Sequence, residues 1–297
     1  MVISRLSWTY ALSFLISFSI ILSTAPSSSV QAWGTDGHRI ICNIAQQLLN
    51  PIALSAVEEM LPDTEDGHLA HLCSWADHIR HTKGYEWSVP LHYIDTPNNR
   101  CTYSPMRDCM DAAGTPNACA SGAITNYTEQ MRTRIDQYNM TEALLFLSNI
   151  VGDIHQPLNV GFEGDRGGKS IELHWYNTHT NLHHVWEIGI LLRDVNQFFA
   201  GNVAALTKSI YENITTVWSQ EASHWSKCAG GEIACPDLYA TESMTAACVF
   251  AYHGASNGTT LSDYYFLSRL EVIHRRLAQA GVRLAGILNQ LFPDEGS

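Results

Sequence analysis

The sequence has little positive charge. Only 17 Lys and Arg residues stand against 29 Asp and Glu residues, so the 297-residue chain carries a formal charge of −12. Proteins that bind nucleic acid through their own side chains usually contact the phosphates with Lys and Arg. The composition therefore argues against such a binder, unless bound metal cations supply the missing charge.

Several common sequence motifs are also missing. The chain has no Gly-rich phosphate loop, no serine nucleophile elbow and no nucleophilic-cysteine motif. No two cysteines have the two-residue spacing of a zinc knuckle. Repeats, linkers and low-complexity segments are absent after residue 32, so we expect one compact domain over residues 33–297.

No apolar run reaches the roughly 18 residues that a membrane span needs. Arg5 precedes a Ser-interrupted apolar run over residues 8–22, and the small residues Val30 and Ala32 precede Trp33. This pattern predicts a signal peptide over residues 1–32 that is cleaved before Trp33, with an uncleaved anchor as the alternative. We therefore expect a protein of the secretory pathway, either extracellular or in a vacuolar or endomembrane compartment, without membrane contact.

Cysteines and glycosylation sequons support export. An even number of cysteines in an exported chain predicts four disulfides, although the pairing does not follow from the sequence. The eight cysteines are Cys42, Cys73, Cys101, Cys109, Cys119, Cys228, Cys235 and Cys248. Four sequons predict a glycoprotein, at Asn126, Asn139, Asn213 and Asn257.

Helical periodicity dominates the rest of the chain. Residues 84–120, rich in Pro, Asn, Gly and Cys, predict a long loop, and residues 169–176 predict a short strand or hairpin arm. The expected fold class is all-α: a single compact helical domain with a small β-hairpin and long disulfide-stapled loops. Helices are predicted over residues 36–49, 51–61, 68–81, 122–138, 182–193, 195–218, 239–252 and 262–291.

The stretch LLFLSNIVGDIHQPLN, residues 144–159, predicts a buried helix. Thr141 is placed to cap its start, and Pro157 prevents its continuation. Asp153 interrupts this apolar pattern. A carboxylate in such a helix needs a charged partner or a metal, or it lies at a solvated helix end, and the stretch alone leaves both open.

Other His and acidic residues have spacings that suit a metal. His183 and Glu187 are four residues apart in NLHHVWE, so that both can lie on one helix face and bind one zinc ion, although such pairs are more often surface pairs. Asp77 lies in CSWADHIR, and His92 in PLHYID could equally be a packing residue. His38 completes WGTDGH after Trp33.

These motifs, in their order along the chain, resemble those of the plant bifunctional nucleases. Those enzymes are members of a zinc-dependent, single-strand-preferring nuclease family, which shares its fold with bacterial zinc phospholipase C. The resemblance runs from Trp33 to about Phe292 and also covers GDIHQPL, GGKSI, CPDLYATES and LSDYYFLSRL. It implies the disulfide pairs Cys42–Cys73, Cys101–Cys248, Cys109–Cys119 and Cys228–Cys235.

The resemblance also implies three zinc ions. Trp33, through its α-amino group and carbonyl oxygen, and His38 would hold one, and Asp153 would bridge it to a second on Asp77 and His92. His183 and Glu187 would hold the third. Tyr93 and Asp95 match the base-stacking and base-edge positions. The implied enzyme is a monomer that hydrolyses single-stranded DNA and RNA to 5′-phosphate products and also cleaves 3′-nucleotides, with Asp153 as its catalytic residue.

Two positions depart from the family pattern. Asn149 and Asn159 stand where the family has His ligands, and imidazole is much the better ligand for zinc. The second and third zinc sites are therefore short of ligands, and we expect weakened activity or altered metal dependence. The alternatives are a catalytically inactive, nucleotide-binding secreted glycoprotein and, with less support, a phospholipase C-like phosphodiesterase.

Overall fold

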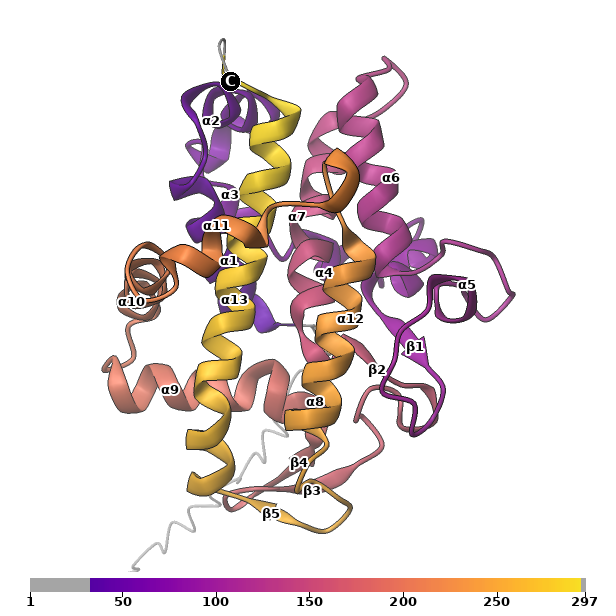
Figure 1. Cartoon of the computed structure of the whole chain (residues 1–297), viewed down its shortest axis with the longest axis vertical. Coiled ribbons are helices and arrows are strands. Elements are labelled where there is room, and N and C mark those ends of the chain that lie inside the picture. The colour runs from indigo at the N-terminus through magenta and orange to yellow at the C-terminus, as the bar shows by residue number, and fades with distance from the viewer. Residues whose placement is uncertain (1–32, 295–297) are drawn as a thin grey trace, which may run out of the picture.

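The computed structural model describes residues 33–294 and is mostly helical (Figure 1). This confirms the all-α prediction. The predicted signal peptide lies outside the described residues. The helices are α1 Gly34–Gln47, α2 Pro51–Met60, α3 Leu69–Leu72, α4 Trp75–Ile79, α5 Pro105–Asp108, α6 Ala120–Thr133, α7 Met140–His155, α8 Leu182–His184, α9 Ile190–Phe198, α10 Val203–Thr215, α11 Ser219–Trp225, α12 Pro236–Ala246 and α13 Asp263–Leu291.

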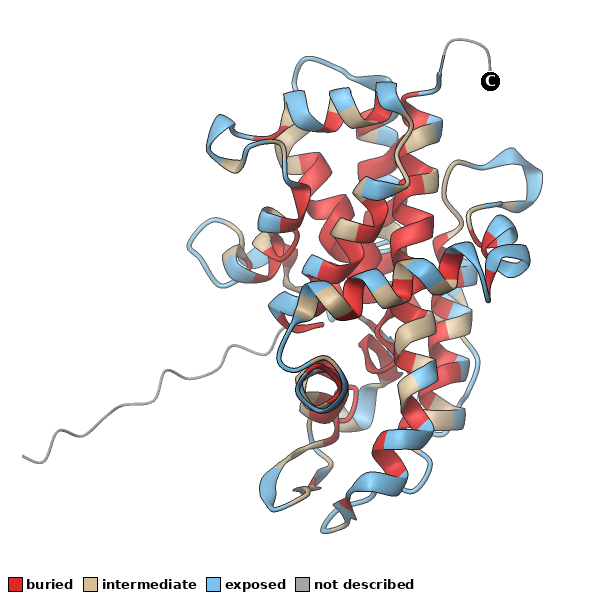
Figure 2. Ribbon diagram, turned by 90° about the vertical axis from the view of Figure 1, so that its left-hand side faces the viewer, coloured by how far each residue is buried: buried red, intermediate tan, exposed pale blue. Residues whose placement is uncertain are grey.

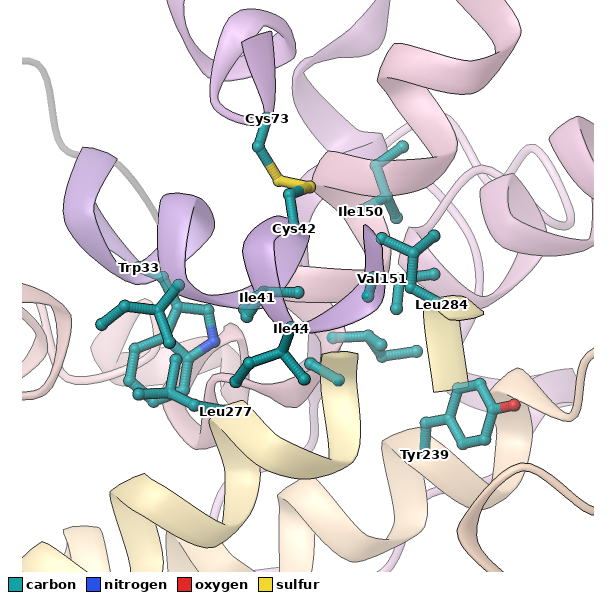
Figure 3. Packing of buried hydrophobic residues seen from close by; sticks show 14 of the residues in the cluster. Trp33, Ile41, Cys42, Ile44, Cys73, Ile150, Val151, Tyr239, Leu277 and Leu284 are labelled. Carbon is teal, nitrogen blue, oxygen red and sulfur yellow. A yellow bond between two sulfur atoms is a disulfide. The ribbon is translucent and has the colours of Figure 1, made fainter. Parts of the chain in front are cut away.

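The long helix α13 packs against α1 and α7, and all three helices are rich in buried residues (Figures 1 and 2). Figure 3 shows Ile41 and Ile44 of α1 close to Leu277 of α13, with Ile150 of α7 near by. All four side chains are fully buried. The apolar packing fixes α1 and α7 side by side, and each of them carries one predicted zinc ligand, His38 or Asp153.

Five short strands form two small sheets: β1 Ile94–Thr96, β2 Val160–Phe162, β3 Glu172–Trp175, β4 Thr178–Asn181 and β5 Thr260–Leu261. β3 and β4 form the expected antiparallel hairpin, and β5 pairs in parallel with β3. β1 lies in the segment predicted as loop and pairs in parallel with β2. Because Ile94 lies opposite Val160, this pairing brings the PLHYID segment beside the end of α7.

Four disulfides join Cys42 to Cys73, Cys101 to Cys248, Cys109 to Cys119 and Cys228 to Cys235. These are the pairs that the resemblance implies. The first bond connects α1 to the residue that follows α3, close to the start of α4. It therefore ties the helix that carries His38 to the segment that carries Asp77.

Several helix boundaries differ from the predictions. The predicted helix over residues 195–218 is wrong, because the chain turns at Ala200 and Gly201, both with positive φ, between α9 and α10. The predicted helix over residues 68–81 is interrupted between α3 and α4. Asn139, rather than Thr141, caps α7: its side chain accepts a hydrogen bond from the Glu142 backbone N–H (3.1 Å).

Among the described residues, no helix combines the length and apolar character needed to cross a membrane. Three of the four sequon asparagines, Asn126, Asn139 and Asn257, are exposed, and Asn213 is half-buried. These positions are compatible with glycan attachment, which stays a prediction.

Candidate metal centre and adjoining cavity

His38, Asp77 and Asp153 form a fully buried cluster at the meeting point of α1, α4 and α7. His38 Nε2 lies 3.2 Å from Asp77 Oδ2 and 3.3 Å from Asp153 Oδ1. Gly152 makes this approach possible, because a Cβ atom at that position would lie 2.7 Å from His38 Nδ1. The glycine before the central carboxylate thus leaves room for the imidazole of α1.

His92 joins this cluster from the end of the 3₁₀ helix Glu86–His92. Its Nδ1 lies 2.7 Å from Asp153 Oδ2 and 3.6 Å from Asp77 Oδ1. The structure therefore brings four predicted metal ligands together from segments between residues 38 and 153.

The pKa values of His38 and Asp77 show that this cluster stabilises positive charge. Burial alone would lower the pKa of His38, but the close contacts with Asp153 and Asp77 outweigh it and raise that pKa to about 9. Burial would likewise raise the pKa of Asp77, yet contact with His38 and the positive charges of His92 and Arg80 hold it well below its usual range. Two buried carboxylates of this kind require compensating positive charge.

Several polar atoms of this cluster are also available to bind a metal ion. His38 Nε2, His92 Nε2, Asp77 Oδ1 and Asp153 Oδ1 are buried and make no well-aligned hydrogen bond in the described structure, although His38 Nε2 lies 3.3 Å from Asp153 Oδ1 and Arg80 Nη1 lies 3.1 Å from Asp77 Oδ1. Buried polar atoms normally have partners, so a group of four such atoms needs an explanation. Imidazole nitrogens and carboxylate oxygens are zinc ligands, and the ligand atoms of His38, Asp77 and Asp153 lie within 4.8 Å of one another.

Asn149, one turn before Asp153 on α7, points its amide nitrogen at this cluster. Its Nδ2 donates to Asp77 Oδ2 (3.0 Å) and to the Cys73 carbonyl (3.1 Å), and its Oδ1 is buried without a partner. In this orientation the side chain positions Asp77 by a hydrogen bond. Asn159 likewise donates from Nδ2 to the backbone carbonyl of Asp153 (3.1 Å).

His183 and Glu187 lie in one continuous helical segment, as predicted, but Val185–Gly189 is wound as a π-helix between α8 and α9. His183 Nδ1 lies 2.7 Å from the Gly167 carbonyl and donates to it, so that Nε2 is left for a ligand. Gly167 has φ of +62°, and a Cβ there would lie 2.2 Å from the Leu158 carbonyl. Only glycine allows this turn to reach His183.

The electrostatics of this corner, defined by His183 and Glu187, differ from those of the first cluster. Burial, together with the positive charge of Lys169, lowers the pKa of His183 to about 3. Burial raises the pKa of Glu187, and the charge of Asp77 adds to this effect. Both carboxylate oxygens of Glu187 are buried and make no well-aligned hydrogen bond in the described structure, and His184 Nδ1 lies 3.6 Å from Oε2. A neutral imidazole and an unpartnered carboxylate can both accept a cation.

A cavity of about 350 Å³ adjoins the metal cluster. The sequence-predicted residues His92, Tyr93, Asp95, Asn159 and His183 line it. The Asp95 side chain on β1 is only partly covered, and this partial burial together with the nearby charge of Glu163 raises its pKa. The predicted base-binding pair thus shares one cavity with two of the predicted zinc ligands, His92 and His183.

Trp33 is fully buried and immediately precedes α1. Together with Glu187 it lines a smaller pocket of about 140 Å³. The first residue of the predicted mature chain therefore lies beside Glu187 of the third predicted zinc site. It also lies directly before the helix that carries His38.

Comparison with known proteins decides the family. The model of the S1/P1 nuclease family matches residues 33–293. The chain belongs to the S1/P1 nuclease family. It is 46% identical over 281 residues to Endonuclease 1 of Arabidopsis thaliana, covering 93% of this chain and 92% of that protein. Endonuclease 4 of Arabidopsis thaliana is 43% identical over 279 residues, covering 92% and 93% of the two chains.

A fungal S1/P1 nuclease is more distant: Nuclease P1 of Penicillium citrinum is 30% identical over 275 residues, covering 89% of this chain and 99% of that protein. Membership of the S1/P1 nuclease family confirms the resemblance inferred from the motifs. The family match begins at Trp33, where signal cleavage is predicted.

The sequence analysis missed three basic residues that line the cavity, Arg80, Arg166 and Lys169. Arg80 Nη1 lies 3.1 Å from Asp77 Oδ1. Its position three residues after Asp77 on a helix is a usable sequence signal. Arg166 and Lys169 flank the Gly-Gly pair of GDRGGK, and only the fold shows that this turn faces His183.

Proposed function

We propose that this chain is a zinc-dependent endonuclease that hydrolyses phosphodiester bonds of single-stranded DNA and RNA and also acts on 3′-nucleotides. One observation carries the proposal: the cluster of unpartnered imidazole and carboxylate atoms opens beside a cavity lined by Tyr93 and Asp95. Family membership and the names of the relatives support the nuclease class.

Zinc would be held by Trp33, His38, Asp77, His92 and Asp153, with Asp153 shared between two ions. When bound, zinc lowers the pKa of a coordinated water and neutralises charge on the phosphate. The ions also provide the positive charge that the acidic chain lacks, so the composition no longer argues against a nucleic-acid substrate.

The chain's own residues orient the reaction. In the hydrolysis, the oxygen of a water molecule bonds to phosphorus, the P–O3′ bond breaks, and the 3′ oxygen departs with a proton, leaving a 5′-phosphate and a 3′-hydroxyl. Asp153 orients that water and accepts its proton, while solvent supplies the proton for the departing 3′ oxygen and later takes the proton from Asp153.

Base recognition explains the preference for single strands. The Tyr93 ring provides a face on which an unpaired base stacks, and the Asp95 carboxylate bonds to the edge of that base. A base in a duplex is not available for either contact.

Asn149 and Asn159 weaken this enzyme. Both amide nitrogens are engaged as hydrogen-bond donors, to Asp77 and to the Asp153 backbone, in place of imidazole ligands. If one stabiliser of the departing oxygen is lost, the rate falls on the order of 10²–10³-fold. The same two contacts favour the second candidate, a secreted glycoprotein that binds nucleotides without hydrolysing them.

The N-terminal processing belongs to the same proposal. Residues 1–32 act as a signal peptide, and cleavage before Trp33 frees the α-amino group for zinc. The four disulfides fit the oxidising conditions of the secretory pathway. The mature domain then covers residues 33–297.

The test uses the chain that begins at Trp33, produced with its disulfides, and measures zinc per chain together with release of 5′-mononucleotides from single-stranded DNA and RNA. We expect slow, zinc-dependent release that chelation abolishes, and Asp153→Asn is the inactive control. Asn149→His combined with Asn159→His should raise both the zinc content and the rate. If the natural chain releases nothing at any zinc concentration while this double variant is active, the nuclease proposal fails and the nucleotide-binding alternative stands.

A further inference from the structure

The corner of His183 and Glu187 does not fit a third zinc ion. It offers two strong protein ligands, because the third position is held by Asn159, whose amide nitrogen donates to the Asp153 carbonyl and whose amide oxygen is a weaker ligand for zinc than imidazole. Zinc bound in catalytic sites usually has three protein ligands. His183 of this corner nevertheless lines the cavity in which a phosphate would lie, so another positive group is needed there.

Lys169 is placed by the turn that holds His183. The Gly167 carbonyl accepts from His183 Nδ1, and the Gly168 carbonyl accepts from the His183 backbone N–H (3.3 Å). Lys169 follows directly, and its own backbone N–H donates to the Arg166 carbonyl (3.4 Å). The lysine therefore has a fixed backbone position next to the imidazole, and its side chain lines the same cavity as His183 and Asn159.

The charge of Lys169 is available to a ligand. Within residues 33–294, no carboxylate lies within 4.0 Å of its ammonium, whereas Arg80 pairs with Asp77 and Lys208 pairs with Glu212. Lys169 is half-buried at the cavity wall. An acidic chain with 17 basic residues places three of them around this one cavity, which points to an anionic occupant.

We propose that the Lys169 ammonium takes the place of a third metal ion at the corner of His183 and Glu187 and binds the substrate's phosphate group there. This rests on the proposed nuclease function. Lysine binds phosphate as a compact point charge, without the fixed geometry that a metal ion imposes. A positive charge on Lys169 also disfavours a divalent cation between His183 and Glu187.

The experiment compares Lys169→Met, which keeps the length of the side chain without its charge, with Lys169→Arg, which keeps the charge. Lys208→Met is the matched control, because it removes the same charge from an exposed ion pair on α10. Each zinc-loaded mature chain is titrated with inorganic phosphate by calorimetry, and its zinc content is measured by mass spectrometry.

We expect at most two zinc ions per natural chain and an unchanged zinc content in every variant. Phosphate affinity should fall about 10- to 100-fold in Lys169→Met, the loss expected for one hydrogen bond to a charged group. It should change less than about threefold in Lys169→Arg and Lys208→Met, since both keep a cation at position 169.

Three results would each overturn the inference: a third zinc ion in the natural chain, an unchanged phosphate affinity in Lys169→Met, or loss of zinc in that variant. None of these measurements needs turnover. A natural chain that binds phosphate through Lys169 but hydrolyses no single-stranded DNA would refute the nuclease proposal alone.

Discussion

The Glu242 carboxylate pairs with two buried arginines that hold the end of α7. Its replacement should therefore destabilise the protein. Arg276 and Arg283 of α13 are 4% and 1% exposed, and both donate to the Glu242 carboxylate at 2.6–2.8 Å. Arg283 also donates to His155 Nε2 (2.8 Å), and Arg276 donates to the His155 carbonyl (3.2 Å). His155 is the last residue of α7, two residues after Asp153.

The substitution Glu242→Gln keeps the shape of the side chain and removes its charge. Removal of one partner from a buried ion pair costs about 3–5 kcal/mol. The lower end applies because the Glu242 side chain is 31% exposed. About 3 kcal/mol corresponds to a fall of about 6–12 °C in Tm for a domain of this size, at roughly 2–4 °C per kcal/mol.

The pH dependence of this effect has a definite sign. Burial would raise the pKa of Glu242, but the hydrogen bonds and charges of Arg283 and Arg276 outweigh it and lower that pKa. The stabilisation is therefore complete above the unfolded-state pKa of a glutamate, about 4.3, and is lost as the pH falls through the lower folded-state value. Consequently the difference between the natural chain and Glu242→Gln should be full at pH 7 and should shrink in acid.

The assay is denaturant unfolding of metal-free protein with its disulfides intact, at pH 7 and at several lower pH values. Glu221→Gln is the matched control, because Glu221 pairs with Arg275 of the same helix but is 54% exposed. Exposed pairs contribute about 0–1 kcal/mol. The reasoning is refuted if both variants lose the same free energy of unfolding, or if the loss in Glu242→Gln does not depend on pH.

Two further substitutions test the central helix. Gly152→Ala would place a methyl group 2.7 Å from His38 Nδ1. We therefore expect zinc affinity to fall about 10- to 100-fold, as when a supporting contact of a ligand is lost. Equilibrium dialysis measures the affinity, and an unchanged value would show that His38 does not bind zinc. Ser148→Ala, one turn earlier and equally buried, is its control. Asn139→Ala removes the cap of α7 and should lower the free energy of unfolding by about 1 kcal/mol. Asn139→Asp keeps the cap and removes only the sequon. Equal thermal stabilities of these two variants would contradict the capping role of Asn139.

Much of the fold could be predicted because its elements follow from local patterns. The central helix α7 begins and ends within a few residues of its prediction, since an apolar run bounded by Asn139 and Pro157 has few other conformations. Residues 195–218 were predicted as one helix because the apolar pattern continues across Ala200 and Gly201. A left-handed alanine is itself unusual, but Gly201 and the N-cap Asn202 that follow it are a helix stop and start signal that the prediction overlooked.

The site could be predicted only in part. The ligand candidates came from spacing and from the resemblance, and the fold brings His38, Asp77, His92 and Asp153 together. The parallel pairing of β1 with β2, and the turn that sets Lys169 beside His183, depend on contacts between distant segments. No local pattern in the sequence encodes such contacts.

The Cys42–Cys73 disulfide makes metal affinity and redox state thermodynamically linked. It closes the loop between the helix that carries His38 and the segment that carries Asp77. With the bond reduced, a metal ion would itself have to bring these two ligands together. Its binding free energy would then be weakened by the free energy of ordering the two segments. By reciprocity, a bound ion would make the disulfide harder to reduce by the same factor. The bond would therefore act as a part of the candidate metal site without touching the ion.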